Sequence, residues 1–234
     1  GGKICNSSKS AIYCDSSDST VQIDGGYICN NSVNEIGGGA IYSEGADVTV
    51  SGGYIFSNSA STNANGGGGA IYARGGSVAL NGGYLFDNSA KGGYGGAVYM
   101  KDGTLTVSDS AVLAGNRSVK EGGIEGTGTL DAGGGAVALF GSTVTIRGGY
   151  ITGNESEKTG GGLYCRKSSA VTMDGGYVTN NKAQNYGCEG AHINMDGGGG
   201  IRLEENSNLT LNGGYITGNM ACSGAGICVT GKSS

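Results

Sequence analysis

Apolar residues in this chain fall in short alternating runs that are separated by glycine-rich or polar turns. One unit, at residues 68–88, contains three such runs, "GGAIYA", "SVAL" and "YLFDN". Alternation with a period of two places successive side chains on opposite sides of an extended strand. No apolar spacing of three and four residues persists anywhere, so the pattern predicts three short strands per unit and no helix.

The unit recurs along the chain and closes each time on an asparagine. These residues are Asn31, Asn58, Asn88, Asn116, Asn154, Asn181 and Asn219, with separations of 27, 30, 28, 38, 27 and 38 residues. A period of about 27 residues with occasional insertions is typical of a solenoid. We therefore predict an all-β fold, a right-handed single-stranded parallel β-helix of about eight coils. It forms one array over residues 1–234, with partial coils at both ends and insertions at residues 117–132 and 182–196.

Stacking of coils turns equivalent apolar positions into buried columns, and these columns are the predicted core. One of them is Ile28, Ile55, Leu85, Leu113, Ile151, Val178 and Ile216. Paired glycines precede all of these positions except Leu113, and they are expected at tight corners, where a positive φ or close backbone approach excludes a Cβ. The seven asparagines are expected at the next corner, where their amides bond the neighbouring coils as a structural ladder.

Two tetrapeptide motifs recur in step with these columns. Residues 38–41 and 68–71 read "GGAI", residues 95–98 and 134–137 read "GGAV", and a hydrophobic-x-x-Asn motif such as "LFDN" or "ITGN" follows each. This combination resembles the GGA(I/L/V) and FxxN repeats of polymorphic outer-membrane proteins, and the resemblance covers most of the chain. It departs from that pattern where Ile, Leu or Val replaces the Phe of FxxN. The resemblance implies a β-helical passenger domain that is displayed on a bacterial surface and acts as an adhesin.

Tyrosine is the most frequent residue at the outward positions. One predicted outer ladder is Tyr27, Tyr54, Tyr84, Tyr150, Tyr177 and Tyr215. A second predicted outer ladder is Tyr13, Tyr42, Tyr72, Tyr99 and Tyr164. Stacking between rungs would stiffen a glycine-rich coil, because aromatic neighbours add stability beyond burial. A platform for a glycan or a partner protein is the functional alternative.

One group of aromatic residues, at and beside the first ladder, points more strongly to a function. Phe56 and Phe86 follow Tyr54 and Tyr84 by two residues, so all four are expected to cluster on one exposed face. Contiguous exposed aromatic side chains usually mark an interface or a ligand surface. These four residues are the candidate ligand or partner surface, and coverage by a neighbouring insertion is the alternative.

Seven cysteines allow disulfides and leave at least one thiol over. Cys5 and Cys29 occupy one outward column on adjacent rungs, and Cys188 and Cys222 lie in loops beyond the asparagine corner of adjacent coils. Both pairs are predicted disulfides, which favours an oxidising, extracellular or cell-surface location. Cys165 alternates inward and is expected to be buried, as is Cys14.

Charge and composition argue against several partners and cofactors. The formal net charge is −5 and no basic run is present, so no nucleic-acid partner is expected. No stretch approaches the length that spans a bilayer, so no membrane insertion by this segment is expected. Cys188 and His192 are two ligands too few for a structural zinc site, and no metal or cofactor is predicted.

Catalysis is also not expected. Glycan-cleaving chemistry needs clustered carboxylates, or a base beside bound cations. The column after the second tyrosine ladder is instead a predicted solvated edge of mixed charge: Glu44, Arg74, Lys101, Phe140, Arg166 and Glu204.

These observations favour a non-enzymatic extracellular or cell-surface β-helix, an adhesin-like stalk or binding module whose partner is a glycan or protein on another cell. One alternative is a structural subunit whose copies stack end to end in a fibre. Light scattering that finds a stable monomer at all concentrations would contradict it. A glycan-active enzyme is the second alternative.

Overall fold

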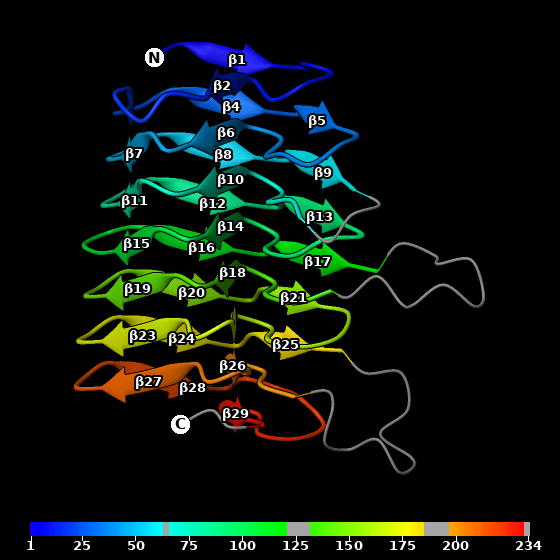
Figure 1. Ribbon diagram of the computed structural model, residues 1–234, viewed down its shortest axis with the longest axis vertical. Coiled ribbons are helices and arrows are strands. Elements are labelled where there is room, and N and C mark those ends of the chain that lie inside the picture. Colours follow the sequence, from blue (N-terminus) through cyan, green and yellow to red (C-terminus); the bar gives the residue numbers. More distant parts are fainter. Residues whose placement is uncertain (63–65, 121–131, 185–196, 232–234) are drawn as a thin grey trace.

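The computed structural model describes residues 1–62, 66–120, 132–184 and 197–231. Within these residues the chain contains no helix and winds into a parallel β-solenoid, with its coils stacked from the N-terminal to the C-terminal end (Figure 1). Every strand pair is parallel, and each strand contacts its equivalents in the coils before and after. The predicted fold class is confirmed.

Each full coil passes through four sheets in the order B, C, A and D. Sheet B consists of β2 (Ile12–Cys14), β6 (Ile41–Glu44), β10 (Ile71–Arg74), β14 (Val98–Lys101), β18 (Val137–Phe140), β22 (Leu163–Arg166), β26 (Ile201–Leu203) and β29 (Ile227–Val229). Sheet C consists of β3 (Thr20–Ile23), β7 (Asp47–Val50), β11 (Ser77–Leu80), β15 (Thr104–Val107), β19 (Thr143–Ile146), β23 (Ala170–Met173) and β27 (Asn208–Leu211).

The two remaining sheets follow in the same coil. Sheet A consists of β1 (Lys3–Cys5), β4 (Tyr27–Cys29), β8 (Tyr54–Phe56), β12 (Tyr84–Phe86), β16 (Val112–Ala114), β20 (Tyr150–Thr152), β24 (Tyr177–Thr179) and β28 (Tyr215–Thr217). Sheet D consists of β5 (Ser32–Val33), β9 (Ser59–Ser61), β13 (Ser89–Lys91), β17 (Arg117–Val119), β21 (Glu155–Ser156) and β25 (Lys182–Ala183).

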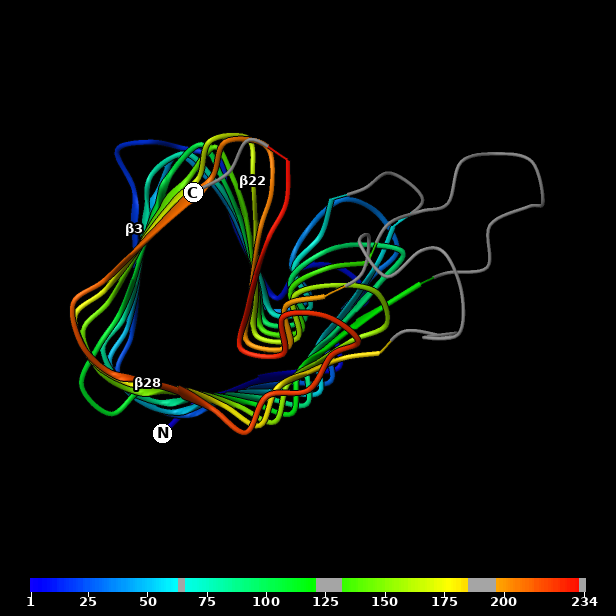
Figure 2. The ribbon, with the colours of Figure 1, turned by 90° about the horizontal axis from the view of Figure 1, so that it is seen from below.

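Sheets B, C and A enclose the core, as the view along the stack shows (Figure 2). Alternate residues of their strands point inward, and the predicted columns are almost all fully buried. Ile216, near the C-terminal end, is the member of the column beginning at Ile28 that is only partly buried. The alternation of the sequence therefore assigned the inner faces of these three sheets correctly.

Sheet D was not anticipated by the sequence pattern. Its strands of two or three residues extend beyond the three-sided coil, and the chain then returns toward sheet B (Figure 2). Residues 117–119 and 182–183 were assigned to insertions, but they form rungs of this sheet, so both insertions were predicted to begin too early. Residues 121–131 and 185–196 of these insertions lie outside the described residues.

The paired glycines meet both expected requirements at the corner before sheet A. A Cβ on Gly82 would collide with the backbone carbonyl oxygen of Ser51 in the preceding coil. Gly83 has a φ of +77°, in the left-handed region that favours glycine. At the far end of sheet A, Ser57 and Asp87 also adopt left-handed conformations, at +52° and +53°, directly before the ladder asparagines.

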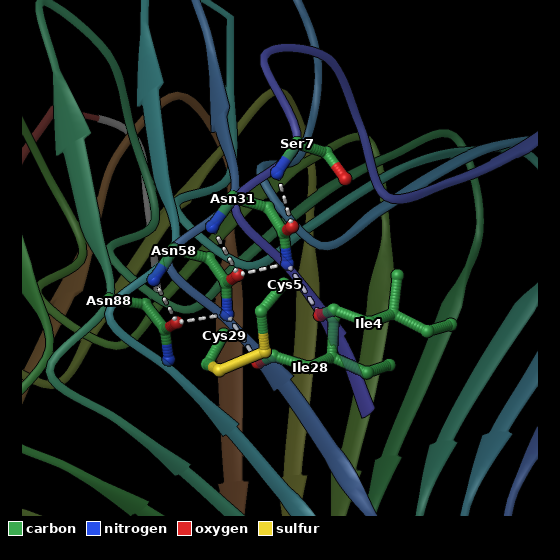
Figure 3. Close-up of a disulfide and its surroundings, with 8 residues drawn as sticks. All are labelled: Ile4, Cys5, Ser7, Ile28, Cys29, Asn31, Asn58 and Asn88. Carbon is green, nitrogen blue, oxygen red and sulfur yellow. Dashed lines mark hydrogen bonds between the residues drawn. A yellow bond between two sulfur atoms is a disulfide. The ribbon is translucent and has the colours of Figure 1, made fainter. Parts of the chain in front are cut away.

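The seven asparagines form a continuous hydrogen-bonded ladder, as predicted (Figure 3). Asn88 illustrates the pattern. Its Nδ2 donates to Oδ1 of Asn116 at 3.0 Å and to the carbonyl oxygen of Ile55 at 2.9 Å. Its Oδ1 accepts from the backbone N–H of Asn58 at 3.0 Å and from Nδ2 of the same residue at 3.0 Å. The amide of Asn88 therefore links three successive coils in a site without exposed surface, whereas Asn219 at the C-terminal end of the ladder is only partly buried.

One predicted disulfide is present. Cys5 and Cys29 are joined across β1 and β4 next to the N-terminal end of the ladder (Figure 3). Cys188 lies outside the described residues, so the Cys188–Cys222 pairing stays a prediction. Cys165 is a buried free thiol, as expected, and burial raises its pKa, whereas Cys14 is only partly buried.

Candidate functional site

The aromatic patch, defined as Tyr54, Phe56, Tyr84 and Phe86, lies on the outer face of sheet A. The middle residue of β8 and of β12 is buried, so the residues on either side of it point outward. In-register pairing stacks Tyr54 on Tyr84 at 5.3 Å and Phe56 on Phe86 at 4.9 Å between ring centroids. Both pairs of rings therefore stack on the outer face of sheet A, and their role as a ligand or partner surface stays a prediction.

The patch is open to solvent and limited to a few rungs. Tyr54 and Tyr84 expose 42% and 47% of their surface, so no described segment covers them. Tyr27 extends the tyrosine stack by one rung at 5.4 Å, while the smaller Val112 and Ala114 on β16 end the patch on the C-terminal side. The result is a compact apolar area of five rings.

Polar groups border this apolar area. Exposed Ser57 and Asp87 directly follow the two phenylalanines, at the left-handed corner of their coils. Each exposed tyrosine also carries a hydroxyl that can donate or accept a hydrogen bond. Apolar rings with hydroxyl and carboxylate groups beside them can stack on a flat partner and also fix its orientation.

The second predicted tyrosine ladder stands on the outer face of sheet B, as expected, but three of its members are not exposed to solvent. Tyr72, Tyr99 and Tyr164 are 7%, 5% and 2% exposed. They stand on the outer face of sheet B, but Tyr94, on the segment that returns from sheet D, packs with them in a second apolar cluster. Alternation identified the face of the sheet correctly and could not indicate that another segment covers it.

Phe140 was predicted on a solvated edge, and this prediction is wrong because Phe140 is buried. Ala138 on β18 takes the place of a tyrosine, which interrupts the ladder between Tyr99 and Tyr164. The Phe140 ring lies 5.2 Å from Tyr99, and Tyr94 lies 5.0 Å from Phe140 and 5.6 Å from Tyr164. Two rings from other positions therefore bridge the gap that Ala138 leaves.

We expect the fold to lose stability at alkaline pH because of these buried phenols. Burial raises the pKa of Tyr72, Tyr99 and Tyr164 above that of a solvated tyrosine. The unfolded chain then releases these protons first, near pH 10, so their stabilising effect is complete below about pH 10 and decreases as the pH rises further. A pH titration that follows tyrosinate absorbance and circular dichroism together should show part of the absorbance appearing only with unfolding. Complete tyrosinate formation in a folded chain would contradict this expectation.

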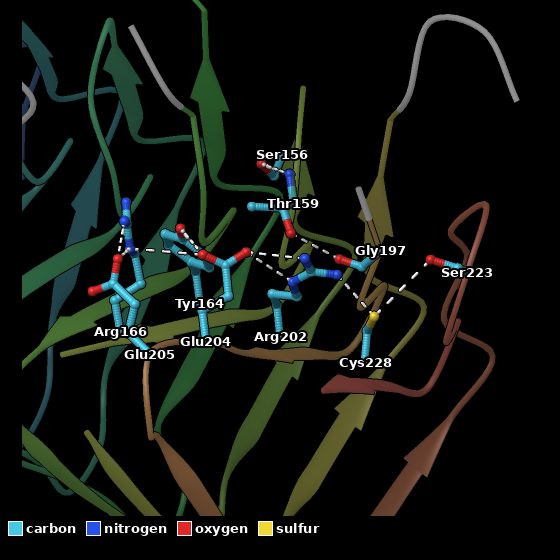
Figure 4. Close-up of polar contacts among 10 residues, drawn as sticks. All are labelled: Ser156, Thr159, Tyr164, Arg166, Gly197, Arg202, Glu204, Glu205, Ser223 and Cys228. Atoms are coloured by element: carbon cyan, nitrogen blue, oxygen red, sulfur yellow. Dashed lines mark hydrogen bonds and ion pairs between the residues drawn. The ribbon is translucent and has the colours of Figure 1, made fainter. Parts of the chain in front are cut away.

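The predicted charged edge of sheet B is present but largely paired. Glu44 and Arg74 form an exposed ion pair at 3.0 Å. Glu204 accepts hydrogen bonds from the Tyr164 hydroxyl at 2.8 Å and from Nε of Arg202 at 3.0 Å (Figure 4). These donors occupy the carboxylate, which leaves it poorly placed to act as a general base.

Arg166 and the buried Arg202 extend this network. Arg166 pairs with Glu204 at 3.6 Å and also with Glu205. Burial acts to lower the Arg166 pKa, but the hydrogen bond that its guanidinium donates to Glu205 raises it overall. Nη1 of Arg202 lies 2.8 Å from Sγ of Cys228 (Figure 4). The network links β22, β26 and β29 on their outer side.

The part of the chain that the structure describes contains no group of three or more His, Cys, Asp or Glu side chains that could hold a metal ion. Cys188 and His192, which the sequence offers as two possible metal ligands, lie outside the described residues. No described segment forms a helix long and apolar enough to cross a bilayer.

The fold and its ladders define a parallel β-solenoid with an asparagine ladder. Comparisons with protein-family models, with curated proteins and with solved structures find no match for this chain.

Proposed function

We propose that this protein is a non-enzymatic β-helix binding module of the cell surface or extracellular space, with the aromatic patch as its contact surface. The partner is a glycan or a protein on another cell. The observation that carries the proposal is the open cluster of Tyr54, Phe56, Tyr84 and Phe86. Aromatic rings that keep part of their apolar surface in water are costly, and contiguous ones usually serve recognition.

Three further features support this proposal. The Cys5–Cys29 disulfide is typical of an oxidising compartment outside the cytosol. The GGA(I/L/V) repeats resemble those of surface-displayed adhesins, and a rigid solenoid presents its outer faces at fixed spacing. The carboxylates of the Glu204 network are held by arginine and tyrosine donors, which favours a binding function over hydrolysis.

Replacing Phe56 and Phe86 together by serine is expected to abolish binding on a glycan array and on host cells, because both apolar contact rings are removed. Each ring is only half-buried, so the fold should survive, and an unchanged far-UV circular dichroism spectrum would verify this. The matched control is Tyr150→Ser with Tyr177→Ser, which removes two stacked rings from the same face further along the stack.

Four results would contradict the proposal. The double phenylalanine variant could bind as the wild type does, or the Tyr150 and Tyr177 control could lose binding to the same extent. Loss of the fold together with binding would place both phenylalanines in packing. Cleavage of any glycan that the wild type binds would contradict the non-enzymatic part.

A further inference from the structure

A cavity of about 460 Å³ opens between sheet B and the returning segments in the first two coils. One wall is the stacked pair Tyr13 and Tyr42, whose ring centroids are 4.7 Å apart and nearly parallel. The opposite wall contains Val33 and Ile36, and Ile36 is 45% exposed. The volume lies in the range of small-ligand sites, and most of the lining is apolar or aromatic.

The same cleft is filled further along the stack by a ring of the chain itself. Tyr94 stands on the returning segment, is 2% exposed and stacks on Tyr164 of sheet B at 5.6 Å. In the first two coils no comparable ring is present among the described residues, and Tyr13 remains 65% exposed. The space between the returning segment and sheet B therefore accepts an aromatic ring of a polypeptide, and no described ring occupies it beside Tyr13 and Tyr42.

Gly37 in the second coil is equivalent to Tyr94. The strands that begin at Ile41, Ile71 and Val98 pair in register, and Gly37 and Tyr94 each lie four residues before the start of their strand. A Cβ on Gly37 would meet nothing closer than the Ser10 hydroxyl at 3.4 Å, followed by Val33 at 3.5 Å. At Gly133, by contrast, a Cβ would lie 2.6 Å from the Tyr164 ring. A Cβ would therefore fit beside Gly37, in ordinary contact with Ser10 and Val33, and both of these residues line the cavity.

We propose that this cavity binds an aromatic side chain of a partner polypeptide, which stacks on the Tyr13–Tyr42 pair as Tyr94 stacks on Tyr164. Glycines flank Tyr94 on both sides, in the sequence GGYGG, and they let the backbone approach sheet B closely. A tyrosine between glycines is accordingly the segment that fits best. This site lies on sheet B and is separate from the aromatic patch on sheet A.

Charged groups beside the rings suit a peptide in this position. Lys9 and Glu35 line the cavity and form an ion pair with each other, and both side chains are more than half exposed. They offer a donor and an acceptor for the amide groups that flank an inserted ring. The Tyr42 hydroxyl is already held by Glu44 at 2.8 Å, which fixes this part of the wall.

The test uses the peptide acetyl-Gly-Gly-Tyr-Gly-Gly-amide, titrated into the full chain and followed by NMR shifts of both partners. We expect saturable binding by the wild type. Gly37→Tyr should abolish it, because the new ring occupies the cavity from within, and Gly37 is not in the left-handed region. Tyr13→Ser should weaken binding about twofold to tenfold, the range of one aromatic contact.

Several controls make the outcome decisive. Tyr13 is exposed, so Tyr13→Ser should keep the far-UV spectrum even if Gly37→Tyr does not fold. Replacing Phe56 and Phe86 by serine should leave peptide binding unchanged, which separates this site from the proposed contact surface. The proposal is overturned if the wild type does not bind, if a leucine peptide binds equally well, if methyl glucoside displaces the peptide, or if Tyr13→Ser has no effect.

Discussion

Asn88→Ala is expected to destabilise the solenoid far more than an ordinary corner substitution, by about 3 kcal/mol or more, because each buried polar group left without a partner costs about 1–3 kcal/mol. The Asn88 amide makes four hydrogen bonds, and its loss orphans the carbonyl oxygen of Ile55 and the backbone N–H of Asn58. Both groups lie where water has no access. Urea unfolding followed by circular dichroism should show a clearly lower midpoint.

Asn208→Ala is the matched control for this experiment. Asn208 is exposed and begins β27, so its removal should change the free energy of unfolding by less than about 0.5 kcal/mol and leave the urea midpoint almost unchanged. Equal midpoints for Asn88→Ala and the wild type would show that water replaces the amide. A role for the ladder in stability would then have to be abandoned.

Phe140→Ala is the second substitution with a large expected effect. Removing a buried phenylalanine typically costs about 3–5 kcal/mol, because transfer energy is lost and a cavity remains. Here the cavity would open between Tyr99 and Tyr94, where Ala138 offers no ring to close it. The same urea measurement should detect the loss.

Two comparisons test the cause. Phe140→Leu keeps apolar volume and should lose less, and Phe86→Ala removes a half-exposed ring from sheet A and should also lose less. Combining Tyr94→Ala with Phe140→Ala should cost less than the sum of the two, since the rings touch at 5.0 Å. Strict additivity would indicate that the rings do not act as one cluster.

The features that the sequence predicted correctly are those that depend on neighbouring coils. In a solenoid each unit contacts only its neighbours, so the sequence pattern that sets the strands and corners of one unit also sets the contacts between units. The glycine corner at Gly83, the ladder position of Asn88 and the outward pair Phe56 and Phe86 each follow from one unit and its copies. Because neighbouring coils repeat the same sequence pattern, a prediction made for one unit also predicted how that unit packs on the next.

Sheet D could not be predicted in the same way. Strands such as β21 (Glu155–Ser156) and β13 (Ser89–Lys91) are too short to show an alternating pattern. They are extended because the ladder asparagine before them fixes the corner, and because the equivalent residues of the adjacent coils pair with them. That pairing exists only in the stack.

By itself the sequence determined the solenoid, its inner columns, the asparagine ladder and the aromatic patch, because alternation decides which face of a strand a side chain occupies. Only the tertiary structure decided what lies on the outer face of sheet B. The chain returns from sheet D over that face, buries Tyr99 and Phe140 in the middle coils, and leaves Tyr13 open in the first. Burial depends on the segment that covers a face, and that segment belongs to a different part of the coil.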